Sequence, residues 1–562
     1  MKEAHFHLDN TPSHSYMKFL YKYPQKKFPY EDLVEENARR DRLEREYQIL
    51  DTGVFDDNRY WDIFIETAKE DDDEEELVFR VIAYNRGPEP APLHIIPHVW
   101  FRNTWAWGYK NEKPSIQRTG PLTAKSTHWK LGERYVKLSP SPATSSSEED
   151  IIPQMLFTEN DSNFKGLWGT ENPQPYVKDA FHRFIVDEEK DAVNPGNSGT
   201  KFAAWYAFDE GDGIPPGECA IVRFRLSRKP EQYVDEAMLD SVIEQRKSDA
   251  DDFYYRVNPL PMSSDLRNIQ RQAFAGMMWS KQYYNFVWEQ WMNGDPGVIP
   301  PPPQRKNIRN QHWRHMYSDD ILSMPDSWEY PFFAAWDTAF HCIPLAMIDP
   351  DFAKKQLDIL TREWYMHPNG QLPAYEWNFS DVNPPVHAWA VFRVFKIERK
   401  MYGRQDLDFL ERVFQKLLLN FTWWVNRKDI YGKNVFEGGF LGLDNIGLFN
   451  RSEPLPTGGV LEQADSTGWM AFYCVSMLNM ALELAKHRRI YEDSKYALIY
   501  ILTFPVLTMR SVASKFFEHF LLISDAMTFR EEGQVRSLWN EDDWYVSIYD
   551  LHFPFPPNPL CV

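Results

Sequence analysis

The spacing of apolar residues changes near residue 260, and this change limits the folds that the chain can adopt. Between Tyr60 and about residue 230, apolar and polar residues alternate in short runs bounded by Gly, Pro and Asp, which is typical of β-strands. From Leu266 onward the apolar residues recur at helical spacing, starting with the aromatic-rich segment 273–291. The sequence therefore predicts an antiparallel β-sandwich followed by a domain of packed helices.

Each region gives a set of expected elements. Strands are expected at 61–68, 77–85, 93–105, 127–138, 201–208 and 220–226. Helices are expected at 233–252, where a charged amphipathic segment connects the two regions, and at 351–365, 385–401, 406–428, 465–487 and 512–528. The segment from Gly294 to Gln304 is rich in proline, which excludes a helix, so a surface loop is expected there.

The composition argues against several classes of protein. With 562 residues, of which 43% are hydrophobic and 15% aromatic, the chain can bury a core in at least two domains. A net charge of -20 argues against nucleic acid and an anionic membrane as partners. The four cysteines show neither metal-ligand spacing nor a disulfide pattern. The first residues are polar, and the most apolar run, 497–507, is too short to span a bilayer, so we expect a cytoplasmic protein without a bound metal.

Three motifs between Trp328 and Ala390 combine aromatic residues with acidic and turn-forming residues. They are WEYPFFAAWD at 328–337, HPNGQLPAYEW at 367–377 and DVNPPVHAW at 381–389. Aromatic rings stack on the apolar faces of sugars, and carboxylates and amides bind sugar hydroxyls, so this composition is typical of a carbohydrate pocket. The alternative is that the aromatic residues belong to a core, as most large aromatics do. A core, however, does not need the adjacent acids and the Pro-Asn-Gly turn.

On these motifs the chain resembles glycoside hydrolase family 63, the family of processing α-glucosidase I, and within it the bacterial and fungal glucosidase-like branch. The resemblance extends over nearly the whole chain. It implies a β-sandwich followed by an (α/α)6 barrel, and hydrolysis of α-glucosidic bonds with inversion by carboxylates, without a cofactor. It also implies a sandwich domain at 1–232 that begins within the fold, a helical linker at 233–262, the first part of the barrel at 263–543 and an unrelated tail at 544–562.

Asp444 is the candidate general acid. It lies in the glycine-rich segment FLGLDNIG, and apolar surroundings favour the protonated carboxyl that a general acid needs. On composition alone, a helix cap or an Asx-turn is the more common role for such an acid. The resemblance of this segment to the acid-bearing segment of the family is what implies a catalytic role.

The resemblance also implies which residues hold the sugar. Asp337 matches an aspartate with that role in the family. The other candidates for lining the pocket are Tyr330, Trp336, Glu376, Trp377, Asn383, His387 and Asp465. From the sequence pattern alone, Asp465 is equally well explained as an acid at a helix N-terminus, near the positive end of the helix dipole.

An inverting glycosidase needs a second carboxylate as general base, and the base of the family lies downstream of every segment matched here. Residues 494–511 and 544–562 do not resemble the family, and we expect translated introns of a fungal gene there. A genuine insertion and a divergent tail are the alternative. We therefore expect this chain to be nearly inactive, and the complete protein to hydrolyse an α-glucosyl oligosaccharide or a small glucoside. A non-catalytic carbohydrate-binding protein, or another (α/α)6 enzyme such as a trehalase-like hydrolase or a lyase, remain alternatives.

Overall fold

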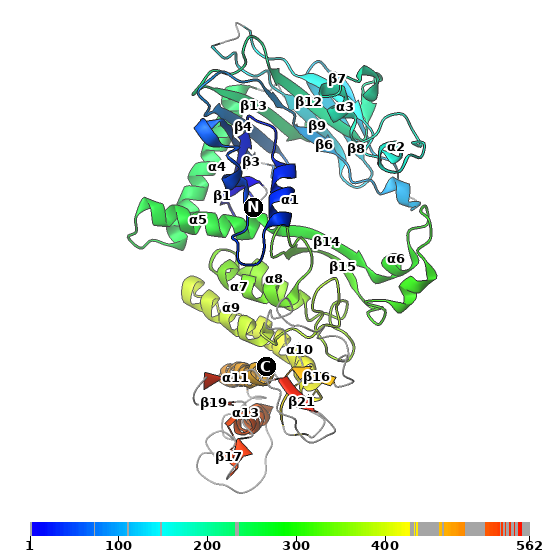
Figure 1. Ribbon diagram of the computed structural model, residues 1–562. Helices are drawn as coiled ribbons and strands as arrows, with labels where there is room; N and C mark the ends of the chain where they lie inside the picture. Colours follow the sequence, from blue (N-terminus) through cyan, green and yellow to red (C-terminus); the bar gives the residue numbers. More distant parts are fainter. Residues whose placement is uncertain are drawn as a thin grey trace. The chain divides into compact units, whose positions relative to one another are not determined.

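The computed structural model of the chain describes residues 3–71, 73–109, 112–145, 149–230, 235–427, 432, 434–436, 460–463, 466–488 and 512–528, together with five short strands between 530 and 552. The chain divides into two compact units (Figure 1). The first comprises Met1–Trp279 and Asp295–Pro300, and the second comprises Ser280–Gly294 and Pro301–Val562.

A nine-stranded antiparallel sheet dominates the first unit, with its strands in the spatial order β1-β2-β3-β4-β13-β9-β8-β7-β11. These strands are β1 (Ala4–Asn10), β2 (Tyr16–Pro24), β3 (Tyr60–Lys69), β4 (Leu77–Asn85), β7 (Ser115–Gly120), β8 (Thr123–His128), β9 (Gly132–Leu138), β11 (Ser198–Gly199) and β13 (Cys219–Ser227). A smaller sheet contains β5 (Leu93–Ile95), β6 (His98–Trp100), β10 (Gln154–Thr158) and β12 (Lys201–Phe208). The predicted strands are confirmed, except that 93–105 yields two short strands and 127–138 is divided by a turn.

The two sheets share one hydrophobic core. Trp61 and Val136 of the large sheet pack with Phe157 and Phe202 of the small sheet, and all four side chains are almost fully buried. Successive residues of a strand point to opposite faces, so the alternation in the sequence supplies one apolar face for each sheet. The first region is therefore the layered antiparallel structure that the alternation predicts.

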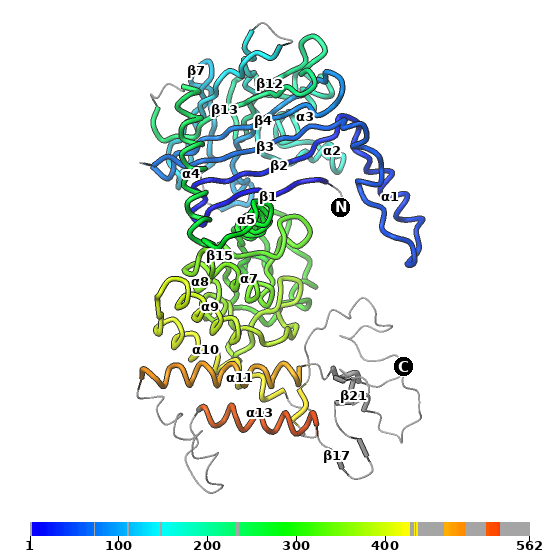
Figure 2. The backbone as a smooth tube through the Cα atoms, turned by 90° about the vertical axis from the view of Figure 1, so that its left-hand side faces the viewer, coloured from blue at the N-terminus to red at the C-terminus, as the bar shows by residue number. Residues whose placement is uncertain are grey.

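Helices complete the first unit. The long helices are α4 (Glu236–Val257) and α5 (Ser264–Trp279), and the short ones are α1 (Tyr30–Arg39), α2 (Phe164–Trp168) and α3 (Ala180–Ile185). The side chain of Asp235 caps α4 by accepting a hydrogen bond from the backbone N–H of Ala237. The α4 helix then packs on β2, β3 and β4, where Ile243 meets Val78, and α5 lies along β1 (Figure 2). The helix expected at 233–252 thus exists and covers the large sheet.

The helix expected over 273–291 is confirmed at its two ends, in α5 and in α6 (Trp288–Asn293), and is wrong between them. After α5 ends at Trp279, the chain forms β14 (Lys281–Val287), which pairs with β15 (Tyr317–Ser323). Along β14, Tyr284 and Phe286 are buried and their neighbours are more exposed, which is the period of a strand. The aromatic residues of this segment are so closely spaced that they fit the period of a helix as well as that of a strand. Pairing with a distant strand determines that the segment is a strand.

The second unit is mainly helical. Its helices are α6 (Trp288–Asn293), α7 (Ala335–Ile348), α8 (Pro350–Ile359), α9 (His387–Tyr402), α10 (Leu407–Val425), α11 (Ser466–Ala485) and α13 (Val512–Thr528). Its remaining short strands are β16 (Val460–Gln463), β17 (Arg530–Glu531), β18 (Gln534–Val535), β19 (Trp539–Asn540), β20 (Trp544–Tyr545) and β21 (Tyr549–His552). The five helices expected between 351 and 528 are confirmed, although α8 ends at Ile359 and is shorter than expected.

Helices pack on helices throughout this unit. The α7 helix contacts α8 and α9, and α11 contacts α9, α10 and α13, with α11 and α13 side by side in Figure 2. Within the described residues these helices do not show a closed barrel. Among the same residues, α11 is long and apolar enough to cross a membrane, but 56% of its apolar window is buried against other parts of the protein. A buried core helix accounts for this composition.

Candidate functional site

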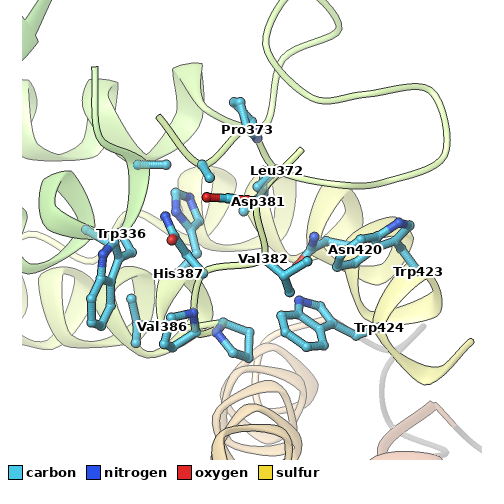
Figure 3. A pocket seen from close by; sticks show the side chains of 16 residues that line it. Trp336, Leu372, Pro373, Asp381, Val382, Val386, His387, Asn420, Trp423 and Trp424 are labelled. Atoms are coloured by element: carbon cyan, nitrogen blue, oxygen red, sulfur yellow. The ribbon is translucent and has the colours of Figure 1, made fainter. Parts of the chain in front are cut away.

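A pocket in the helical unit is the candidate site. It contains about 430 Å³ of empty space, part of which is open to solvent. Trp336 lies on one side and Trp423 and Trp424 lie on the other, with Asp381 and Val382 between them (Figure 3). The pocket is lined by Ala335, Trp336, Ala339, Leu372, Pro373, Ala374, Asp381, Val382, Asn383, Pro384, Pro385, Val386, His387, Asn420, Trp423 and Trp424.

Backbone hydrogen bonds connect the N-terminus of α7 to the loop that forms the next wall. The N–H of Ala335 donates to the carbonyl of Ala374 at 2.8 Å, and the N–H of Glu376 donates to the carbonyl of Phe333 at 3.3 Å. These bonds satisfy backbone groups that would otherwise be unpaired at the helix end. Trp336 is therefore held in a fixed position relative to Leu372 and Pro373.

Asp381 is the acidic residue that lines the pocket within the described part of the chain. Its carboxylate accepts a hydrogen bond of 2.6 Å from the Tyr375 hydroxyl and one of 2.8 Å from Nδ2 of Asn378. Asn378 also accepts a hydrogen bond from the backbone N–H of Ser380. The two donors fix the orientation of the carboxylate, and its remaining lone pairs can accept from a ligand hydroxyl.

His387 is the first residue of α9, and its imidazole is buried. Its Nε2 lies 2.8 Å from the carbonyl oxygen of Leu357, so this nitrogen carries the proton and donates. Burial lowers the pKa of His387 to about 4, although the Leu357 carbonyl and Asp358 act in the opposite direction. The ring is therefore neutral at neutral pH, and Nδ1 is a hydrogen-bond acceptor.

Asn420 joins α10 to the loop that contains Gly370. Its Nδ2 donates to the Gly370 carbonyl at 2.8 Å, and its Oδ1 accepts from the Tyr473 hydroxyl at 3.0 Å. Gly370 has φ +95°, and a Cβ atom there would lie 2.5 Å from the carbonyl oxygen of Leu419. Only glycine allows this close approach of loop and helix.

The structure brings three of the predicted residues together in the pocket: Trp336, Asn383 and His387. Asp337 follows Trp336 in the first turn of α7 but is not part of the pocket wall, and burial raises its pKa. Glu376 lies beside the buried hydroxyl of Tyr284, where its charge contributes with burial to a raised pKa of that tyrosine.

Tyr330 and Trp377 lie in a separate aromatic cluster. The Tyr330 ring is 4.2 Å from Phe332, whose ring is 6.3 Å from that of Trp377. Asp444 and Asp465 lie outside the described residues. Among the residues that are described, no group of three or more His, Cys, Asp or Glu side chains could hold a metal ion.

Sequence reasoning missed four polar or aromatic residues of the pocket: Asp381, Asn420, Trp423 and Trp424. Asp381 opens the third motif, so a local signal for it existed in the sequence. The other three lie at the end of α10, where Asn420 and Trp424 belong to the buried face of the helix and Trp423 lies beside that face. Only the packing of α10 brings them to the pocket.

One of the comparisons with known proteins points to the same segment. Residues 330–438 match the family described as "Mannosylglycerate hydrolase MGH1-like glycoside hydrolase domain". The chain is also 54% identical over 586 residues to "Uncharacterized protein YMR196W" of Saccharomyces cerevisiae, a similarity that covers 97% of this chain and 52% of the yeast protein. The chain thus spans about half the length of this relative.

Residues 330–438, which lie in the helical unit, are thus similar to a glycoside hydrolase domain. Membership of family 63 itself, and the specificity for α-glucosides, remain predictions.

Proposed function

We propose that the pocket binds a glucosyl residue, and that the protein hydrolyses α-glucosidic bonds in oligosaccharides or small glucosides with inversion. One observation carries this proposal. All pocket-lining residues, from Ala335 to Trp424, lie within the segment 330–438 that matches a glycoside hydrolase domain. The pocket also combines tryptophan rings with carboxylate, amide and imidazole groups, which is the chemistry that a sugar requires.

The side chains have distinct roles in this proposal. Trp336 offers a ring for the apolar face of the sugar, and Asp381 and Nδ1 of His387 accept hydrogen bonds from its hydroxyls. Asp444 is the general acid, which transfers its proton to the glycosidic oxygen as the bond to the anomeric carbon breaks. A second carboxylate removes a proton from the attacking water on the opposite face of the sugar, at a separation of about 6.5–9.5 Å from the acid.

We propose that the general base belongs to a part of the protein outside these 562 residues. The yeast relative is about twice as long as the region it shares with this chain, which leaves room for such a part. In this proposal the helices of the second unit form the first part of an (α/α)6 barrel, and the chain alone turns over little substrate. A cytoplasmic location also belongs to this proposal.

Turnover of α-glucosides tests the assignment. Release of glucose is measured from a panel of α-glucosides with this chain and with a chain extended to the length of its yeast relative, each beside its Asp444→Asn variant. Activity of the extended chain that Asp444→Asn abolishes is the expected result. Rapid turnover by the 562-residue chain would contradict the proposal that the general base lies outside it. Full activity of the Asp444→Asn variant would contradict the assignment of Asp444 as the general acid.

A non-catalytic carbohydrate-binding role is the second candidate. Among the described residues that line the pocket, Asp381 is the one carboxylate, and it already accepts two hydrogen bonds. Hydrolysis needs two carboxylates, whereas binding needs only the aromatic and polar wall. Saturable glucoside binding without hydrolysis by either chain would favour this role.

A further inference from the structure

The segment between Asp295 and Asp319 is strongly basic in an otherwise acidic protein. It contains Arg305, Lys306, Arg309 and Arg314 with His312 and His315, and it contains no acidic residue. The whole chain has 82 acidic and 62 basic residues, so the positive net charge of this segment is opposite to the net charge of the protein. Such concentrations of positive charge create a local field that attracts anions.

Two of these arginines contact the same tryptophan. The guanidinium carbon of Arg305 lies 5.3 Å from the centroid of the Trp291 ring, and that of Arg309 lies 5.7 Å from it. Arg309 also lies 4.2 Å from the ring of Trp377. The two positive charges therefore lie against the same ring, and Arg309 contacts two aromatic rings at once.

The position of Arg309 is fixed by the residue that follows it. Nδ2 of Asn310 donates to the carbonyl of Glu376 at 2.7 Å, and Oδ1 of Asn310 accepts from the N–H of Phe379 at 2.8 Å. The carbonyl of Asn310 accepts a further bond of 2.7 Å from Nε1 of Trp288. These bonds fasten the basic segment to the loop that carries Trp377. Arg305 is held separately by its bond of 3.0 Å to the carbonyl of Trp291.

No acidic group neutralises these side chains in the part of the chain that the structure describes. Arg305, Lys306, Arg309 and Arg314 form no ion pair with any carboxylate there, although ion pairs are frequent elsewhere in the protein. A contact with an aromatic ring stabilises a cation by only about 0.5–1 kcal/mol at an exposed site, so the rings do not replace a counter-ion. Two like charges at one ring repel each other, and an anion that binds beside them would offset this repulsion.

We propose that Arg305, Arg309, Trp291 and Trp377 form a second binding site, which takes the phosphate group of a phosphorylated carbohydrate. Guanidinium groups bind phosphate oxygens through two parallel hydrogen bonds, and two such groups match the double charge of a phosphate monoester. Trp377 is 53% exposed, so part of its ring is open to a sugar.

The choice of a sugar rests on the proposed function, whereas the choice of phosphate does not. The loop that carries Trp377 also supplies Leu372 and Pro373 to the pocket wall, so the second site and the pocket share one structural support. Trp291, Arg305 and Arg309 lie outside the segment that matches the glycoside hydrolase domain. Three of the four residues of the second site thus lie outside the matched segment, and Trp377 lies within it.

Calorimetric titration of the full chain tests the site. The ligands are glucose 6-phosphate, glucose, inorganic phosphate and adenosine monophosphate. The variants are Arg309→Gln, Arg309→Lys and Trp377→Ala. The control is Lys396→Gln, which removes an exposed cation that lies over a different aromatic ring, 4.5 Å from the centroid of Phe392. All variants are first compared by circular dichroism, so that a variant that does not fold is recognised.

We expect glucose 6-phosphate to bind more tightly than glucose. Arg309→Gln weakens its binding by about tenfold or more, since a charge-assisted hydrogen bond contributes roughly 1.5–3 kcal/mol. Arg309→Lys causes a smaller loss because it keeps the charge, and Lys396→Gln causes none. Trp377→Ala weakens the binding of glucose 6-phosphate but leaves that of inorganic phosphate unchanged.

Three results would overturn the proposal. They are equal binding of glucose and glucose 6-phosphate, undiminished binding by Arg309→Gln, and tighter binding of adenosine monophosphate than of glucose 6-phosphate. The last result would indicate that the site binds a nucleotide and not a phosphorylated carbohydrate. These results are distinct from a failure of the proposed function. If the proposed function is wrong, glucosides do not bind in a way that depends on Trp336, but phosphate binding still depends on Arg309.

Discussion

The hydroxyl of Tyr375 donates a hydrogen bond of 2.6 Å to the carboxylate of Asp381, which lines the candidate pocket. Tyr375→Phe removes this donor and leaves Asn378 as the second one. We expect the free energy of unfolding to fall by about 1–2 kcal/mol, as for a hydrogen bond to a charged group, and the affinity for glucosides to fall with it. Denaturant unfolding and glucoside titration measure the two effects.

The control for this variant is Tyr317→Phe. Tyr317 is 54% exposed, so loss of its hydroxyl should change neither stability nor affinity. If Tyr375→Phe behaves like Tyr317→Phe in both measurements, the hydrogen bond from Tyr375 to Asp381 contributes neither to stability nor to glucoside binding.

Gly370→Ala should destabilise the protein strongly. The residue has φ +95°, and the added Cβ would lie 2.5 Å from the Leu419 carbonyl oxygen, so the loop must move away from α10. The expected loss is about 2–4 kcal/mol in the free energy of unfolding, from backbone strain together with the clash. Gly403→Ala is a matched comparison, because Gly403 has φ +66° and no atom near the added Cβ. Its loss should be about 1 kcal/mol, and equal losses for the two variants would contradict the close approach.

Local signals in the sequence were sufficient for most of the helices. Asp406 precedes α10, and its side chain accepts a hydrogen bond of 2.9 Å from the N–H of Phe409, as a residue before an apolar helical repeat is expected to do. The strand β14 had no such signal. Its aromatic residues fit both periods, and its pairing with β15, some 30 residues later in the chain, decides between them.

The same contrast explains what was found and missed in the pocket. Trp336, Asn383 and His387 lie in motifs whose composition is unusual for a core, so the sequence alone indicated them. Trp423 and Trp424 lie in the last turn of a regular helix, where the spacing of Trp424 from Leu417 and Phe421 indicates packing. Their place opposite Trp336 depends on how α10 packs in the second unit, and a single sequence carries no direct signal of that packing.

Trp336→Ala should lower the affinity for neutral glucosides by about tenfold or more, because it removes a ring from the pocket wall. Trp364→Ala is the control, since Trp364 is 41% exposed and is not part of that wall. Titration with methyl α-glucoside, followed by tryptophan fluorescence or calorimetry, measures the effect. Equal affinities of the Trp336→Ala variant and the unchanged chain would show that the sugar does not bind in this pocket.

His387 should make the stability of the protein depend on pH in a defined window. Burial lowers its pKa from 6.5 to about 4, so below pH 6.5 the unfolded chain binds a proton that the folded chain does not. The contribution of His387 to the free energy of unfolding is complete above pH 6.5 and is lost as the pH falls toward 4, by about 1.4 kcal/mol for each pH unit. His387→Gln has no titrating group and can still donate to the Leu357 carbonyl, so its stability should decrease less over this window. Denaturant unfolding of both proteins between pH 4 and 7 gives the comparison, and parallel curves would show that His387 is not buried in its neutral form.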